Sequence, residues 1–242
     1  MFASMLSEMI AAADGVVLEC EHRMAPLFRR SFSDAAVYVR TDPPASDLTA
    51  APADWQISLG SLGRFLRPNL DSFPKPDAYL KADRDKVAGG KRVVGISWRS
   101  GNVKTGLQRS TRLGDWLPVL GDGGSLFINL QYGDVAGEIA DLEARHGILV
   151  YHDETVDQLK NMDDFAAQVA SLDLVISVAN TTVHVADALG VKTWALLASP
   201  ADWRWRLEGT DTPWYGSVKL RRQSTPGDWD RLLIETAAEL RS

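Results

Sequence analysis

The chain has 242 residues, with 26 Lys and Arg against 32 Asp and Glu, a formal net charge of −6 and 45% apolar residues. These ordinary globular values exclude a disordered chain, and no apolar run approaches the roughly 20 residues of a membrane span. The acidic balance argues against nucleic acid or an anionic membrane as a partner held by bulk charge. The single Cys20 cannot form an internal disulfide, and the histidines show no zinc spacing. We therefore expect a metal-free protein of a reducing, cytoplasmic compartment.

The first third of the chain alternates short helices and strands. Apolar residues on one helical face predict a helix over residues 1–13, and Glu8 within it argues against a secretory signal. Strands are expected at residues 16–18, 37–39 and 55–57, and helices at residues 24–32 and 59–66. This alternation is typical of a parallel sheet with crossover helices. Such a sheet normally opens with a strand, so we expect either a variant that opens with a helix or a truncated longer protein.

Residues 67–91 differ from what precedes them. Proline and glycine punctuate a charged stretch that includes Lys81, Asp83, Arg84, Asp85 and Lys86. This composition predicts a linker with one short helix. We therefore place a boundary between an incomplete first domain, residues 1–78, and a second domain, residues 79–242.

The second part has a clearer pattern. Strands are expected at residues 93–98, 126–130, 148–151, 174–178, 193–197 and 218–220. Helices are expected at residues 115–120, 135–146, 163–171, 182–189 and 229–240. Several of these strands are apolar almost throughout, as in a parallel sheet covered on both faces. The predicted fold is α/β with two Rossmann-like halves, the first lacking its opening strand.

Ligands bind such sheets at the carboxyl ends of the strands, and the turn after residue 178 is the most informative one there. Asn180, Thr181 and Thr182 open a helix, which provides hydroxyl caps and free backbone N–H groups for an anion such as phosphate. The alternative is that these residues only cap the helix, as similar residues do in most helices. Arg99 and Lys104, on a neighbouring loop, favour the phosphate site. Surface charge remains the alternative explanation for Lys104 and for Arg109.

Aromatic residues near this edge have two explanations as well. His184 lies one turn into the helix, where a packing or supporting role is commoner than catalysis. Trp214 and Trp229 are expected to fill the core. Trp203 and Trp205 could either pack or form a rim around a sugar or base.

Several segments together resemble one bacterial family. They are GISWRSGN (residues 95–102), FINLQYGD (127–134), residues 154–191, residues 201–223 and PGDW (226–229). They resemble the glycosyltransferase domain found at the carboxyl terminus of tetratricopeptide-repeat proteins. That group is related to the lipopolysaccharide heptosyltransferases of glycosyltransferase family 9 and, more distantly, to O-linked N-acetylglucosamine transferases.

The resemblance implies a GT-B fold, in which two Rossmann-like domains face each other and the second holds a nucleotide diphosphate sugar without a metal or other cofactor. Asn180, Thr181, Thr182 and His184 match the segment that contacts the donor diphosphate. Arg99 and Ser100 match the loop that faces the phosphates. Gln131 and Tyr132 match the loop near the base and ribose.

Two departures from the family pattern matter. Ala179 stands where heptosyltransferase-like members have an acidic residue, and the Gly-Asp loop that carries their expected general base would precede Met1. No catalytic residue is therefore assigned; His152, Asp153, Glu154 and His184 are the weighed substitutes. The sequence predicts a glycosyltransferase-like protein, active or inactive in this form, with an unknown protein or glycan acceptor. The alternative is a non-catalytic interaction module that retains the fold. An incomplete first sheet also predicts self-association through its exposed edge.

Overall fold

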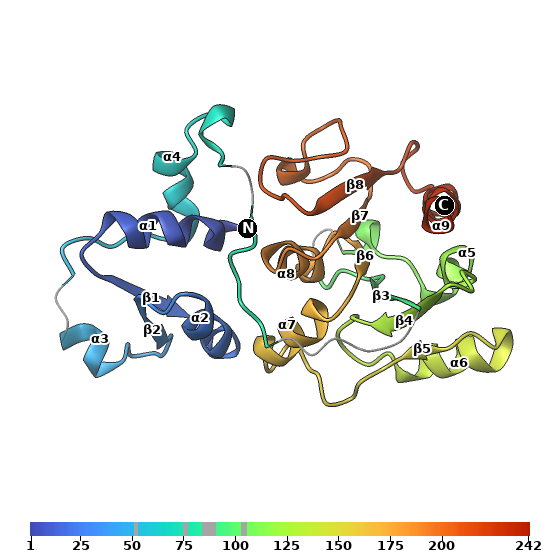
Figure 1. Ribbon diagram of the computed structural model, residues 1–242, viewed down its shortest axis with the longest axis horizontal. Coiled ribbons are helices and arrows are strands. Elements are labelled where there is room, and N and C mark those ends of the chain that lie inside the picture. Colours follow the sequence, from blue (N-terminus) through green and yellow to red (C-terminus); the bar gives the residue numbers. More distant parts are fainter. Residues whose placement is uncertain (51–52, 75–76, 84–90, 103–105) are drawn as a thin grey trace.

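The computed structural model describes residues 1–50, 53–74, 77–83, 91–102 and 106–242. Lys104 and residues 84–90 of the expected linker lie outside these ranges. The described residues form an α/β structure with two parallel sheets, one of two strands and one of six. The elements before residue 74 lie on one side of the molecule and the six-stranded sheet on the other (Figure 1).

The larger sheet is parallel throughout and has the order β5-β4-β3-β6-β7-β8. Its strands are β3 (Arg92–Ser97), β4 (Ser125–Asn129), β5 (Val150–Tyr151), β6 (Leu174–Val178), β7 (Thr193–Leu197) and β8 (Val218–Arg222). The central strand β6 pairs with β3 from Val94 opposite Leu174, and all five of its residues are buried. Burial on both faces is the reason that these strands are apolar almost throughout.

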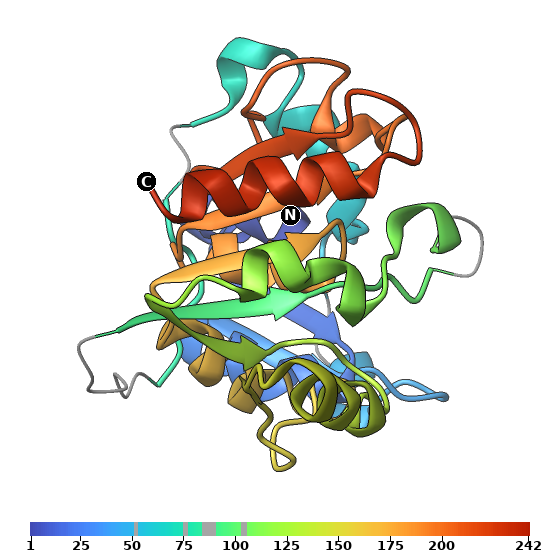
Figure 2. The same ribbon diagram turned by 90° about the vertical axis from the view of Figure 1, so that its right-hand side faces the viewer.

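Helices cover both faces of this sheet. Helices α7 (Met162–Ala170) and α8 (Thr181–Ala188) lie on the face toward the N-terminal elements (Figure 1). Helices α5 (Leu117–Leu120), α6 (Ala136–His146) and α9 (Trp229–Leu240) lie on the opposite face, which is turned toward the viewer in Figure 2. Gly190 follows α8 with a φ of +72°, the left-handed conformation that ends many helices.

The N-terminal part is built around a pair of short parallel strands. Strand β1 (Val16–Cys20) pairs with β2 (Ala35–Val39) from Val16 opposite Ala35, and α2 (Ala25–Ser31) connects them. The remaining elements are the helices α1 (Leu6–Ala12), α3 (Ser46–Ala50) and α4 (Gly63–Leu66) and the 3₁₀ turns η1 (Phe2–Met5), η2 (His22–Met24), η3 (Leu59–Leu62) and η4 (Leu70–Ser72). The predicted parallel pairing of this part is therefore confirmed.

One hydrophobic cluster joins the two parts of the chain. It contains Leu6 and Leu27 from the N-terminal part and Phe165 and Val169 from α7, all four almost fully buried. A second cluster, with Trp98 and Trp116, fills the opposite face of the six-stranded sheet. Side chains from both sides of residue 78 thus share one core, and the division into domains at that residue stays a prediction.

The predicted elements match the structure closely after residue 91 and less well before it. All six strands predicted there are present, and the strands at residues 174–178 and 193–197 have the predicted bounds. The strand predicted at residues 55–57 is wrong: Trp55 is 92% exposed and no described strand pairs with this segment. Helix α3 was not predicted, because its five residues bury no apolar face. Trp205 packs in the core at 1% exposure, whereas Trp203 is 63% exposed.

Candidate functional site

The strand order defines a switch point at the centre of the six-stranded sheet. From β3 the chain adds β4 and β5 on one side and then crosses to add β6, β7 and β8 on the other. In open parallel sheets this arrangement separates the loops after the two central strands and leaves a crevice at their carboxyl ends. The loops in question begin at Trp98 and at Ala179.

Asn180 connects these two loops. Its side-chain amide donates to Ser97 Oγ at 2.7 Å and to the backbone oxygen of Arg99 at 2.9 Å. Its Oδ1 accepts from the backbone N–H of Thr182 at 2.9 Å, so Asn180 is also the N-cap of α8. The capping that the sequence suggested is confirmed, and the same side chain fixes the loop after β3 at the amino end of α8.

Gln131 performs a similar task from the other side. It is buried after β4, and its Oε1 accepts from the backbone N–H groups of Trp98 and Arg99 at 3.0 and 2.7 Å and from Ser97 Oγ at 3.1 Å. Its amide donates to the backbone oxygen of Tyr132. Removal of this acceptor would leave buried donors without partners. Gln131 therefore shapes the loop that carries Arg99.

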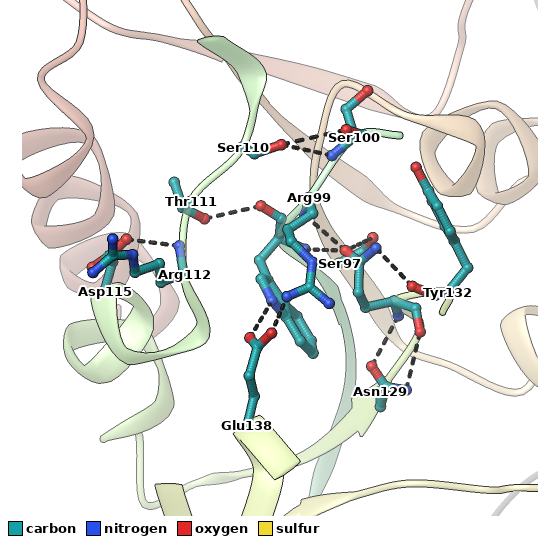
Figure 3. A network of polar contacts seen from close by, with 12 residues as sticks. Ser97, Arg99, Ser100, Ser110, Thr111, Arg112, Asp115, Asn129, Tyr132 and Glu138 are labelled. Carbon is teal, nitrogen blue, oxygen red and sulfur yellow. Dashed lines mark hydrogen bonds and ion pairs between the residues drawn. The ribbon is translucent and has the colours of Figure 1, made fainter. Parts of the chain in front are cut away.

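Arg99 forms an ion pair with Glu138 of α6, and its guanidinium lies 5.6 Å from the ring centre of Trp98. The Trp98 indole donates to the other oxygen of Glu138 at 3.0 Å. Figure 3 shows the Arg99 side chain directed toward Glu138. The arginine predicted to face the phosphates is thus paired with a carboxylate in this structure.

Ser110 and Tyr132 flank the loop after β3, to which Ser100 belongs (Figure 3). The backbone N–H of Ser100 donates to Ser110 Oγ at 3.0 Å, and the backbone N–H of Gly101 donates to the hydroxyl of Tyr132. The structure therefore brings the predicted residues Arg99, Ser100, Gln131 and Tyr132 together with Asn180 around the switch point. Their contacts with a ligand stay a prediction.

The two threonines at the start of α8 differ. Thr181 is exposed, whereas Thr182 is fully buried and its Oγ1 has no hydrogen-bond partner among the described residues. A buried hydroxyl without a partner is uncommon in folded proteins. The amino end of an eight-residue helix, with one exposed hydroxyl, lies at the crevice. Anions are favoured there by the helix dipole and by free N–H groups.

His184 stacks on the rings of Trp205 and Tyr215, which also stack on each other. Its ring lies nearly parallel to Trp205, with the ring centres 5.8 Å apart, and Nδ1 is 2.7 Å from the hydroxyl of Tyr215. Burial is the main cause that lowers the pKa of His184 to about 3, so the imidazole is neutral at pH 7. A base with so low a pKa removes a proton poorly at neutral pH. The geometry therefore gives His184 a supporting position within the first turn of α8.

A cavity of about 260 Å³ lies beside this region, at the carboxyl ends of β4 and β5. It is lined by the loop that begins at Gln131, by the loop that begins at His152, and by Phe165 and Gln168 of α7. His152 Nδ1 lies 2.9 Å from Asn129 Nδ2. Hydrogen bonds from Thr155 lower the pKa of Asp153, which is therefore a carboxylate and a weak base. The cavity combines an apolar wall with amide, imidazole and carboxylate groups.

A third group of side chains was not predicted as part of the site. Asp202, after β7, accepts from Arg109 at 3.1 Å and lies 3.6 Å from Arg204. Arg109 also lines a very small cavity with Ala179, Asp202 and Trp205, next to the amino end of α8. Sequence reasoning left surface charge as an alternative explanation for Arg109, because nothing local links it to a residue more than ninety positions away.

Two absences apply to the described part of the chain only. No described helix has both the length and the apolar character needed to cross a bilayer. The described residues also contain no cluster of three or more His, Cys, Asp or Glu side chains that could hold a metal ion. The groups that the site does offer are helix N–H groups, guanidinium groups and a polar cavity. These suit an anionic ligand with an attached planar or sugar-like group.

No protein-family model matches the chain. Protein FlbA of Caulobacter vibrioides is 33% identical over 266 aligned positions, which cover 100% of this chain and 44% of FlbA. The chain thus spans less than half the length of that relative.

Two solved structures show limited similarity. One is a glycosyl transferase family 9 protein from Veillonella parvula, with a TM-score of 0.43 and 12% identity over 64% of this chain and 47% of that one. The other describes EarP, which mediates arginine glycosylation of translation elongation factor EF-P. Its TM-score is 0.34, with 15% identity over 75% of this chain and 73% of that one. Both of these structures concern glycosyl transfer. The relation to tetratricopeptide-repeat proteins stays a prediction.

Proposed function

We propose that this chain binds a nucleotide diphosphate sugar at the carboxyl edge of the six-stranded sheet and transfers the glycosyl group to a protein or glycan acceptor. The observation that carries the proposal is the proximity of two features. An anion-suited helix end at Thr181 lies at the switch point, and the cavity after β4 and β5 lies on the same edge. The sequence resemblance to the glycosyltransferase domain supports the same assignment.

The cavity suits the nucleoside part of such a donor. Its volume of about 260 Å³ is below the range of roughly 300–1,000 Å³ that encloses a whole drug-sized ligand. It would therefore hold a part of the donor and leave the remainder in the crevice. Tyr132 lines the cavity and also contacts the loop after β3, which supports placing the base and ribose here.

The diphosphate would lie at the amino end of α8, with Ser100, Asn180, Thr181 and Thr182 around it. When the bond to the sugar breaks, negative charge grows on the diphosphate, and fixed N–H dipoles stabilise that charge without rearrangement. Arg99 could add a positive charge only by exchanging Glu138 for the ligand, because the two side chains are paired in the free protein. This part of the mechanism needs neither a metal nor a base.

Glycosyl transfer also requires a general base that deprotonates the acceptor, and these residues are poorly suited to that role. His184 has a pKa of about 3 and its Nδ1 is already bonded to Tyr215. Asp153 is a weak base for the reason given above, and Glu154 is exposed at the rim of the cavity. We therefore propose donor binding and leaving-group stabilisation as the functions of these residues and assign none of them as the general base.

The pairing of Arg99 with Glu138 also favours the second candidate function, a non-catalytic interaction module. The two candidates differ in nucleotide affinity. We expect calorimetric titration of the wild-type protein to show binding of one of UDP, GDP, ADP or CDP, and of the matching nucleotide sugar. An interaction module would bind none of them.

A variant that fills the cavity tests whether the nucleoside binds there. Gln168 lines the cavity from α7, so the indole of Gln168→Trp would occupy the space that the ligand needs. We expect this variant to lower the nucleotide affinity by about tenfold or more. Glu143→Trp places the same ring at an exposed position of α6 and serves as the control. Equal affinity of both variants and the wild type would exclude this cavity as the nucleoside site.

A further inference from the structure

The ion pairs around Asp202 leave several buried polar atoms without partners. Both arginines approach the same oxygen: Arg109 Nη2 lies 3.1 Å and Arg204 Nη2 lies 3.6 Å from Asp202 Oδ2. Among the described residues, Oδ1 of Asp202 and Nε of Arg204 are buried with no hydrogen-bond partner. The three side chains are only 18 to 25% exposed, so water replaces the lost hydrogen bonds poorly.

This arrangement is unlike a well-satisfied structural ion pair. Two guanidinium groups share one carboxylate, which leaves one net positive charge in a half-buried position. A buried pair is stabilising only if its remaining donors and acceptors are also satisfied, and the described residues do not satisfy them. Guanidinium groups bind a phosphate with two parallel hydrogen bonds each, which a single shared carboxylate oxygen does not allow.

The cluster adjoins the proposed site. Arg109, Asp202 and Trp205 line a cavity of about 10 Å³ together with Ala179, the residue before the N-cap of α8. Trp205 is 1% exposed, and its indole Nε1 has no partner in the described structure. The cavity holds roughly one water molecule, so a phosphate group cannot enter while Asp202 stays in place.

We propose that Arg109 and Arg204 bind the anionic group of the ligand, and that Asp202 occupies its place on Arg109 in the free protein. Asp202 is thus a built-in competitor, which the ligand displaces when its phosphate takes over the two guanidinium groups. The inference rests on the proposed function, because the anion is the diphosphate of the donor. The exchange replaces one set of hydrogen bonds by another, and no covalent bond is made or broken.

The test uses inorganic pyrophosphate and the four nucleoside diphosphates on the whole chain. Asp202→Asn removes the competing charge and should raise the affinity for pyrophosphate by about tenfold, the usual effect of one charged hydrogen bond. Asp211→Asn removes the same charge from an exposed position of the same segment and controls for net charge. Arg109→Gln should lower the affinity by about tenfold, and the exposed Arg206→Gln is its control.

A second measurement needs no variant at the ion pair. The indole N–H signal of Trp205 in a ¹⁵N spectrum of the wild-type protein should move during a pyrophosphate titration, because displacement of Asp202 changes its surroundings. The indole of Trp194, which lies over Arg221 with 4.7 Å between ring centre and guanidinium, should not move. This readout holds even if an Asp202 variant folds poorly.

The outcomes separate the inference from the proposed function. If a nucleoside diphosphate binds the wild type, but Asp202→Asn and Arg109→Gln bind like their controls and the Trp205 signal stays fixed, the inference is wrong and the proposed function stands. If neither the wild type nor Asp202→Asn binds pyrophosphate or any nucleoside diphosphate, both are wrong. If Asp202→Asn binds these ligands and the wild type does not, the inference is supported most strongly.

Discussion

At the scale of single residues, the site depends on buried amides that connect segments distant in the sequence. Asn180 and Gln131 both bind the loop after β3, from opposite sides. The role of Asn180 as a helix cap could be predicted, because an asparagine between a strand and a helix has a local signature. Gln131 was predicted at the site, but its contacts more than thirty residues away have no such signature. The ion pair between Arg109 and Asp202 likewise has no local signature in the sequence.

His184 makes a prediction for the dependence of stability on pH. Its pKa is lowered from 6.5 to about 3 in the folded chain, so the unfolded chain binds this proton first as the pH falls. The neutral imidazole therefore stabilises the fold fully above pH 6.5, and this contribution is lost between pH 6.5 and 3. Between pH 7 and pH 5 the wild type should lose about 2 kcal/mol more unfolding free energy than His184→Asn.

Urea unfolding at the two pH values measures this difference. His146→Asn, at an exposed position in the last turn of α6, is the control and should behave like the wild type. Identical pH dependence of the wild type and His184→Asn would show that the imidazole is not buried in neutral form.

At the scale of elements, prediction succeeded where burial on both faces gives a strand a continuous apolar run, as in β6 and β7. It failed at residues 55–57, where apolar side chains alternate but no strand in the described part of the chain pairs with them. Alternation of apolar residues shows that a segment could pair, whereas pairing also needs an available partner edge.

Gly106 supports a prediction about the loop that carries Arg109. A Cβ atom at this position would lie 2.6 Å from the backbone oxygen of Ser100 and about as close to that of Asn102. Backbone atoms cannot move aside as a flexible side chain can, so Gly106→Ala should shift the loop and cost about 1–3 kcal/mol of unfolding free energy. The same shift should weaken pyrophosphate binding through Arg109.

Thermal melting and a pyrophosphate titration test both effects. A Cβ atom on Gly114 would meet nothing within 4 Å, so Gly114→Ala is the matched control and should resemble the wild type in both measurements. Wild-type stability and affinity in Gly106→Ala would contradict the close approach in this loop.

At the scale of the whole molecule, the shared core predicts cooperative unfolding. Leu27 of α2 is fully buried in the cluster that also holds Phe165 and Val169 of α7. Leu27→Ala should lower the unfolding free energy by about 2–5 kcal/mol and lower the melting temperature of the entire chain in one transition. Leu207→Ala, at a position that is 89% exposed, is the control. Two separate transitions, of which Leu27→Ala moves only one, would instead support a division of the chain near residue 78.

The central claim is that the carboxyl edge of the six-stranded sheet binds a nucleoside diphosphate, and thermal melting of the wild type with UDP, GDP, ADP and CDP tests it most directly. A ligand at about 100 times its dissociation constant stabilises the fold by roughly 2.7 kcal/mol. For a chain of this length we predict a rise in melting temperature on the order of 5–10 °C with one of the four nucleotides. The matching monophosphate should give a smaller rise, because it lacks the second phosphate. No rise with any of the four, in a sample that melts cooperatively, would contradict the account and favour the interaction module.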